Sequence, residues 1–198
     1  MSDFKIDYPE GATPLDPDET NGLKLDFIDT QAELNVFEKK NIVAATKWVL
    51  SRRDRDCLNI SFCMDLHKRM FRDVWTWAGK QRQTNKNIGV DWQQITVKLQ
   101  NLFQNTIYWI EHETYSMDEI CIRFHHKLVF IHAFPNGNGR HARLMTEVLQ
   151  NKYNQKRFTW GSKEGSYKSD QEIRGTYIAA LKAADEGDFK LLLEFCRK

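Results

Sequence analysis

The 198-residue sequence lacks the marks of several protein classes. Its four cysteines form no CxxC pair and no zinc-site spacing, so neither a disulfide framework nor a structural zinc is expected. It shows no signal peptide and no apolar run long enough to cross a membrane. We therefore expect free thiols in a reducing cytoplasm and no contact with a membrane.

Charge of one sign is also scarce. The net charge is +2 and no run of lysine and arginine stands out, which argues against direct binding of nucleic acid. The short basic stretch at 51–55 is interrupted by Asp54 and is interpreted as a solvated helix end. No internal repeat is present. With 41% hydrophobic residues, a chain of this length predicts one core and therefore one domain.

Alternating strand patterns are almost absent, so the predicted fold class is all-α. Residues 1–24 are polar and contain three of the four prolines, which predicts an N-terminal arm ahead of a domain at 25–198. Capping boxes at Thr30/Glu33 and Ser116/Glu119 predict two helix starts. The expected helices run from Thr30 to the charged stretch 52–56, over about 61–74, 92–113 and 117–132, from about 140, and over 172–186, with a loop at 161–169 and an apolar segment at 191–195 closing the chain.

One stretch, residues 132–143, combines a helix end, a turn and a helix start. It reads His-Ala-Phe-Pro-Asn-Gly-Asn-Gly-Arg-His-Ala-Arg. Pro135 prevents the preceding helix from continuing, and the glycines let an anion approach the unpaired N–H groups that open the next helix. Arg140 and Arg143 lie on one helical face and can close over outer phosphates, while His132 can face the group that is joined to the phosphate.

This stretch resembles the motif of the Fic family, His-Pro-Phe-x-(Asp or Glu)-Gly-Asn-(Gly or Lys)-Arg-x-x-Arg. Ala133 stands in place of the usual proline, and Asn136 in place of the usual carboxylate. A second block, at 66–82, also resembles the family, in which a leucine-histidine helix runs into a Trp-Ala-Gly-Lys turn. The fixed letters of the first motif that match are His132, Phe134, Gly137, Asn138, Gly139, Arg140 and Arg143.

The resemblance implies a Fic-type helical bundle with a small β-hairpin flap beside the active-site loop. Residues 83–91 follow the second block and are rich in turn formers, so we place the hairpin there. In the family the flap pairs with the backbone of the target protein, and Asn87, Ile88 and Gly89 are the residues expected to dock it. An ordinary loop between helices is the alternative.

The implied activity is protein adenylylation, in which ATP gives AMP to a hydroxyl of a target protein and pyrophosphate leaves. By resemblance, His132 is the general base and Phe134 anchors the loop in the core. Position 136 holds Mg²⁺ in the family; because an Asn oxygen is an uncharged ligand, we expect Asn136 to bind the ion more weakly. Phosphate binding is assigned to Gly137, Asn138, Gly139, Arg140 and Arg143.

Other functions are open from the sequence. The same cradle fits transfer of UMP or of a phosphoryl group, and the substitution at Asn136 fits a regulatory module that binds nucleotide without transferring it. A metal cluster of His125, His126 and His132 is a weaker alternative. Side chains that belong either to the core or to a base-binding site are Trp160, Tyr177 and Phe189.

Regulation and partners are also predicted by resemblance. Many Fic proteins carry a Ser/Thr-x-x-x-Glu-(Gly or Asn) helix whose glutamate blocks the second motif arginine, and no Glu-Gly pair here has that context. Restraint is therefore expected from a separate protein or from the arm around Glu19. The arm sequence and the length resemble mobile mystery protein B, a bacterial Fic subgroup found beside a helix-turn-helix protein, mobile mystery protein A, which becomes a candidate regulatory partner.

Overall fold

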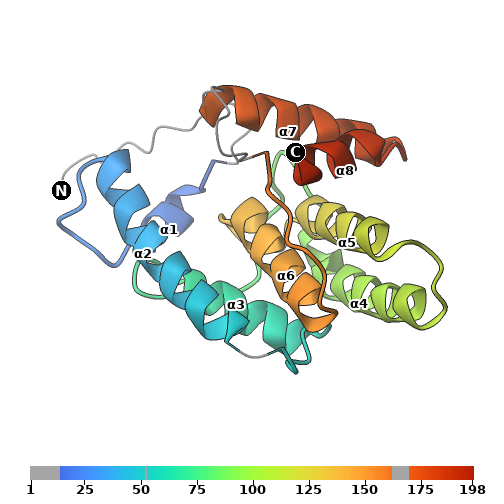
Figure 1. Ribbon diagram of the computed structural model, residues 1–198. Helices are drawn as coiled ribbons and strands as arrows, with labels where there is room; N and C mark the ends of the chain where they lie inside the picture. The colour runs from blue at the N-terminus through green and yellow to red at the C-terminus, as the bar shows by residue number, and fades with distance from the viewer. Residues whose placement is uncertain (1–13, 52, 162–169) are drawn as a thin grey trace.

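The computed structural model describes residues 14–51, 53–161 and 170–198 (Figure 1). Within these ranges the fold is all-α, as predicted, and no helix is both long and apolar enough to span a bilayer. Most of the predicted arm and of the predicted loop at 161–169 lies outside the described residues. The helices are α1 (Pro17–Thr20), α2 (Gln31–Leu50), α3 (Ile60–Phe71), the short 3-10 helix η1 (Trp92–Gln94), α4 (Ile95–Glu111), α5 (Met117–Ile131), α6 (Asn138–Lys152), α7 (Asp170–Asp185) and α8 (Lys190–Arg197).

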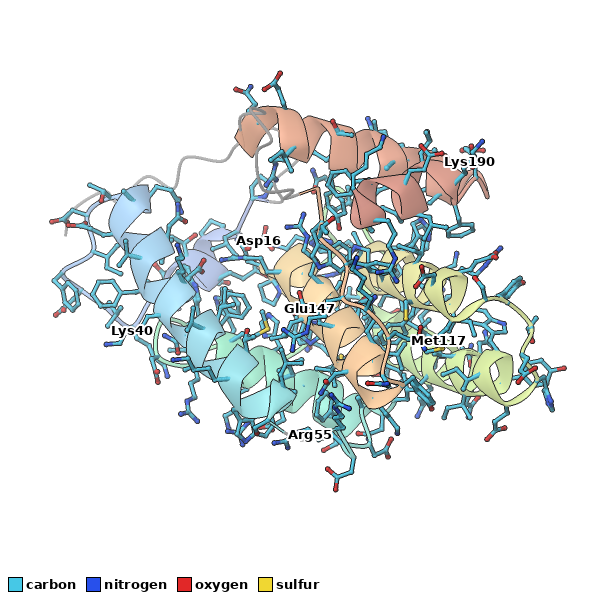
Figure 2. All side chains as sticks on the ribbon, in the orientation of Figure 1. Asp16, Lys40, Arg55, Met117, Glu147 and Lys190 are labelled. Carbon is cyan, nitrogen blue, oxygen red and sulfur yellow. The ribbon has the colours of Figure 1, made fainter. Side chains whose placement is uncertain are left out.

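Helix α6 lies in the middle of the bundle. It packs against α5 on one side and against α2 and α3 on the other, and α4 covers the far side of α5 (Figure 1). Helices α7 and α8 pair with each other, and α8 also contacts α5. Figure 2 shows Glu147 of α6 among the side chains at the centre of the molecule. The two helices that flank the motif are therefore held from several directions.

Helix α2 begins where the sequence predicts. Thr30 accepts a hydrogen bond from the Glu33 N–H, and the Glu33 carboxylate accepts one from the Thr30 N–H at 3.0 Å, which completes the capping box. Its buried face repeats at helical spacing through Leu34, Ala45 and Val49, but it also contains a buried carboxylate, Glu38. A charged side chain in such a face requires a partner inside the protein.

Only one of the two hydrogen bonds of the capping box predicted for α5 forms. Ser116 accepts a hydrogen bond from the Glu119 N–H at 3.3 Å. The Glu119 carboxylate instead pairs with Arg123, one turn further along, at 2.8 Å. An arginine four residues after a glutamate offers a charge-assisted bond that competes with the backbone N–H of Ser116.

The expected β-hairpin at 83–91 is wrong: these residues form turns and bends without strand pairing. The physical reason is Arg82, whose buried guanidinium donates to the backbone carbonyls of Thr84 (2.6 Å) and Val90. Two carbonyls on the opposite arms of the loop are thus bound to one side chain rather than to N–H groups across a ladder. The Val90 N–H, in turn, points to the Ile131 carbonyl at the end of α5, 3.5 Å away.

Candidate active site

His132 caps the C-terminus of α5 in the left-handed conformation, with φ 53° and ψ 58°. Its side chain is 7% exposed, and neither ring nitrogen makes a hydrogen bond of good geometry, although the Val129 carbonyl is close enough to favour the charged ring. A residue other than glycine is strained in the left-handed conformation. A buried imidazole without a firm hydrogen-bond partner lowers the stability of the fold. Both features are typical of a residue kept for chemistry rather than for stability.

The ionisation of His132 fits a proton acceptor. Its pKa is lowered to about 4, chiefly because burial disfavours the charged ring and next because the Arg82 guanidinium is nearby. The ring is therefore neutral at pH 7 and able to take a proton. Gly89 lies directly against it, since a Cβ added to Gly89 would come within 2.6 Å of the His132 Cβ.

The loop after His132 is closed by Asn138. Its side-chain oxygen accepts from the Phe134 N–H at 2.9 Å, and its side-chain nitrogen donates to the Phe134 carbonyl at 2.8 Å. Phe134 itself is buried, as expected of the anchor. The side-chain amide of Asn138 therefore holds the loop. Phosphate binding by Asn138 stays a prediction, and it now concerns the backbone N–H of this residue.

His67 of α3 also holds this loop, by hydrogen bonds and by ring stacking. Its Nδ1 accepts from the Gly79 N–H at 3.0 Å, so its Nε2 carries the proton and donates to the Asn136 carbonyl at 3.1 Å. The ring stacks on Phe134, with centroids 3.6 Å apart. Complete burial, with smaller contributions from His141 and Arg140, holds its pKa well below the usual value, while the bond to Asn136 acts the other way. The neutral His67 ring therefore links the Trp-Ala-Gly block to the motif through two hydrogen bonds.

Asn136 is the predicted metal ligand. Its side-chain oxygen accepts a short hydrogen bond from the N–H of Gly137, its own neighbour. The described residues contain no group of three His, Cys, Asp or Glu side chains that could hold a metal ion. The alternative cluster of His125, His126 and His132 is excluded: His125 Nε2 lies 2.8 Å from the Tyr177 hydroxyl, and His126 Nε2 lies 2.8 Å from Asp185.

The start of α6 retains the features of an anion site. Gly137 has φ 78°, and a Cβ there would lie 2.5 Å from the Phe71 ring, so only glycine fits. A Cβ at Gly139, by contrast, would meet no atom within 4 Å. The first turn of an α-helix leaves N–H groups without intrahelical partners, and open space next to them can accept phosphate.

The two motif arginines have different surroundings. Arg140 is ion-paired with Glu38 of α2 and lies 4.9 Å from the centroid of Phe71. Arg143 lies 4.6 Å from the centroid of Tyr177 and 5.7 Å from that of Trp160. Two of the three aromatic residues considered for base contact therefore gather around Arg143, on the α7 side of α6. The third, Phe189, instead packs under Arg123 at 4.3 Å.

The arm is fastened to the loop beside His132. Lys86 of that loop, whose side chain is 3% exposed, is ion-paired with Asp16 at 2.7 Å and with Glu19. Thr84 also donates to Asp16, at 2.7 Å, and the Trp77 indole donates to the Glu19 carbonyl. Glu19, around which the arm was expected to restrain activity, thus pairs with a lysine of the loop at 83–91.

Sequence reasoning missed three residues that build this site: Glu38, His67 and Arg82. Glu38 had a signal, because a carboxylate in register with Leu34 and Ala45 marks a buried charge. His67 and Arg82 lie inside the second block but have no periodicity that predicts their contacts. Their partners are backbone carbonyls, which the sequence does not show.

The chain is similar to known proteins in sequence and in fold. Residues 57–150, which contain both blocks, match the family model described as Fic/DOC family. The chain is similar to the protein adenylyltransferase fic-1 of Caenorhabditis elegans, with 25% identity over 153 residues. That match covers 75% of this chain and 28% of the relative, so the chain spans less than a third of the relative's length.

Two solved structures share the fold. BepC, a VirB-translocated effector from Bartonella tribocorum with bound AMPPNP, has a TM-score of 0.68 at 15% identity, covering 90% of this chain and 95% of that one. The N-terminal Fic domain of a VirB-translocated Bep effector from Bartonella quintana, with bound ADP, has a TM-score of 0.67 at 15% identity, covering 90% and 94%. At this identity the likeness shows the Fic-like helical fold alone.

Proposed function

We propose that the protein is a Fic-type protein adenylyltransferase, which transfers AMP from ATP to a hydroxyl side chain of a target protein; the match of residues 57–150 to the Fic/DOC family model supports this. The name of the C. elegans relative supports the reaction, and the AMPPNP in the BepC structure supports a nucleotide as the substrate. The target is identified only by its chemistry, a serine, threonine or tyrosine hydroxyl.

One observation carries the proposal: a neutral, buried imidazole stands at the end of α5, one loop before the N-terminus of α6. His132 and the α6 N–H groups belong to the same braced segment, held by Asn138 and His67. A base and an anion site fixed on one rigid loop meet the requirement for joining a hydroxyl to a phosphate.

The roles of the residues follow from this arrangement. His132 takes the proton of the incoming hydroxyl, whose oxygen bonds to the α-phosphorus as the bond to the β-phosphate oxygen breaks. The N–H groups opening α6 stabilise the charge that develops on the phosphate. Arg140 and Arg143 hold the outer phosphates, which leave as pyrophosphate.

Mg²⁺ is compatible with the site in a restricted way. The Asn136 oxygen is the one protein ligand that the motif offers, and it is uncharged and bonded to the Gly137 N–H. The phosphates of ATP would supply the remaining charge. When bound, the ion would neutralise charge on the α- and β-phosphates.

The same observation at Asn136 favours one second candidate, a regulatory module that binds nucleotide without transferring it. A weakly held ion lowers the rate of transfer but not the ability of α6 and the arginines to bind phosphates. Transfer of UMP or of a phosphoryl group is a variant of the first proposal, since the cradle contacts phosphates rather than the base.

We also propose that the protein belongs to the mobile mystery protein B subgroup and is regulated by a helix-turn-helix neighbour. The support is the arm sequence, of which residues 1–13 lie outside the described structure. Mixing the two purified proteins and measuring their mass by light scattering tests this; separate elution at micromolar concentrations would contradict it.

A labelling experiment tests the main proposal. The protein is incubated with a bacterial lysate and ATP labelled at the α- or at the γ-phosphate, beside His132→Ala and the exposed control His112→Ala. Label from the α-position alone, lost in His132→Ala and kept in His112→Ala, is the expected result. Label from the γ-position would identify phosphoryl transfer, and nucleotide binding without label would identify the regulatory module.

A further inference from the structure

Glu38 is the one carboxylate in the buried face of α2, and both of its oxygens are used. Oε1 accepts from the Trp75 indole N–H at 2.7 Å, and Oε2 is ion-paired with Arg140. The Glu38 side chain is 5% exposed. A buried carboxylate is tolerated when its charge and hydrogen bonds are satisfied, and here one of the two partners is a motif arginine.

The pair leaves most of Arg140 available. A guanidinium has five N–H donors in a rigid plane, and the bond to Glu38 comes from one terminal nitrogen. The Arg140 side chain is 40% exposed, so part of the guanidinium meets solvent, although the Phe71 ring lies nearby. Glu38 therefore orients the guanidinium without covering it.

The geometry does not suit a removable inhibitor. Trp75, itself buried and stacked on Trp77, donates to one oxygen of Glu38 while Arg140 bonds to the other, so two partners fix the buried carboxylate. Arg143, which lies on Tyr177, does not share this contact. A fixed carboxylate acting on one of two arginines is a means of positioning that arginine.

We propose that Glu38 is a positioning residue that presents the free N–H groups of Arg140 to the outer phosphates of the nucleotide. This inference rests on the proposed function. An arginine side chain is flexible, and a bound conformation set in advance removes the cost of ordering it when the nucleotide arrives. The contribution is expected for ligands that carry outer phosphates and not for AMP.

Glu38→Gln tests the inference with little disturbance of the fold. The Gln oxygen still accepts the Trp75 N–H, while its amide nitrogen faces Arg140 and removes the ion pair. Binding of AMPPNP and of AMP is measured by calorimetry without a target protein, because the α–β bond that the proposed transfer breaks is intact in AMPPNP. We expect AMPPNP to bind about tenfold more weakly and AMP to bind within about twofold of the unaltered protein.

Two variants keep the result specific. Glu38→Asp retains the charge and should recover part of the AMPPNP affinity, even if Glu38→Gln folds poorly. Asp65→Asn, which breaks the exposed pair with Arg69 on α3, is the matched control and should leave both affinities unchanged. In an Arg140→Gln background, Glu38→Gln should add no further loss, because the two residues act as one unit.

Several outcomes would overturn the inference. Unchanged AMPPNP binding in Glu38→Gln would show that the pair does not position Arg140, and tighter binding would show that Glu38 restrains it. An additional loss in the Arg140→Gln background would indicate a general effect on the fold. If the unaltered protein bound neither AMPPNP nor AMP, the proposed function itself would fail, which is distinct from a protein whose binding ignores Glu38.

Discussion

Replacing His67 with phenylalanine tests whether the motif loop is held by a neutral histidine. The change keeps an aromatic ring stacked on Phe134 but removes both hydrogen bonds, leaving the Gly79 N–H and the Asn136 carbonyl without their partner. Each buried polar group left unpaired costs about 1–3 kcal/mol. Better apolar packing offsets part of this, so we expect His67→Phe to lower the free energy of unfolding by about 2–4 kcal/mol at neutral pH.

The size of this difference should depend on pH. The folded-state pKa of His67 lies well below 6.5, so the unfolded chain takes up a proton near pH 6.5 while the folded protein does not. Stability contributed by the neutral ring is therefore complete above that pH and is lost as the pH falls, by about 1.4 kcal/mol per unit. His67→Phe lacks this loss, so its deficit in the free energy of unfolding should shrink as the pH falls below about 6.5.

Urea unfolding followed by circular dichroism at several pH values measures both effects. The other buried histidines titrate in both proteins, and their contribution cancels in the difference. His112→Phe, at an exposed position, is the control and should show no large deficit. If the difference in the free energy of unfolding did not change with pH, His67 would not be held neutral. A difference below about 0.5 kcal/mol would show that the hydrogen bonds of His67 do not hold the motif loop.

Three further outcomes are expected. Burial raises the pKa of Cys57 to about 11 and those of Cys63, Cys121 and Cys196 to about 12. Ellman's reagent near neutral pH should therefore react with these thiols after denaturation and not before. Fast reaction of the native protein would contradict their burial. Asn136→Asp should raise Mg²⁺ affinity about tenfold and increase transfer, and a Mg²⁺ titration that showed no change would remove position 136 from the metal site. Arg82→Met should destabilise the fold by about 2–4 kcal/mol and speed proteolysis within 83–91, whereas the exposed control Arg72→Met should do neither.

The helices were largely predictable because their signals are local. The Thr30 capping box and the apolar spacing along α2 and α5 depend on residues within one or two turns, and both appear in the structure. Several boundaries differ from expectation. The helix expected over about 61–74 ends at Phe71, and the short helix α1 forms within the predicted arm. The first turn of the predicted helix at 92–113 is the 3-10 helix η1, and the closing segment at 191–195 belongs to the longer helix α8. Position 132 at the end of α5 followed from Pro135 and from the motif.

The hairpin was the main failure, and it shows the limit of local patterns. Turn-forming residues around Ile88 and Val90 are compatible with a hairpin or with a loop, and the choice depends on what pairs with their carbonyls. The buried Arg82 side chain decided it by binding Thr84 and Val90. No sequence period reports that an arginine will turn inward to backbone oxygens.

The sequence by itself determined the order of the helices and the place of the 132–143 motif between two of them, because these depend on residues that are neighbours in the chain. Only the tertiary structure decided how the motif is held. Glu38 and Arg140 are 102 positions apart, and His67 and Asn136 are 69 apart. Such pairs form because helix packing brings buried polar groups together, and a polar group removed from water must bond to whatever the fold places beside it.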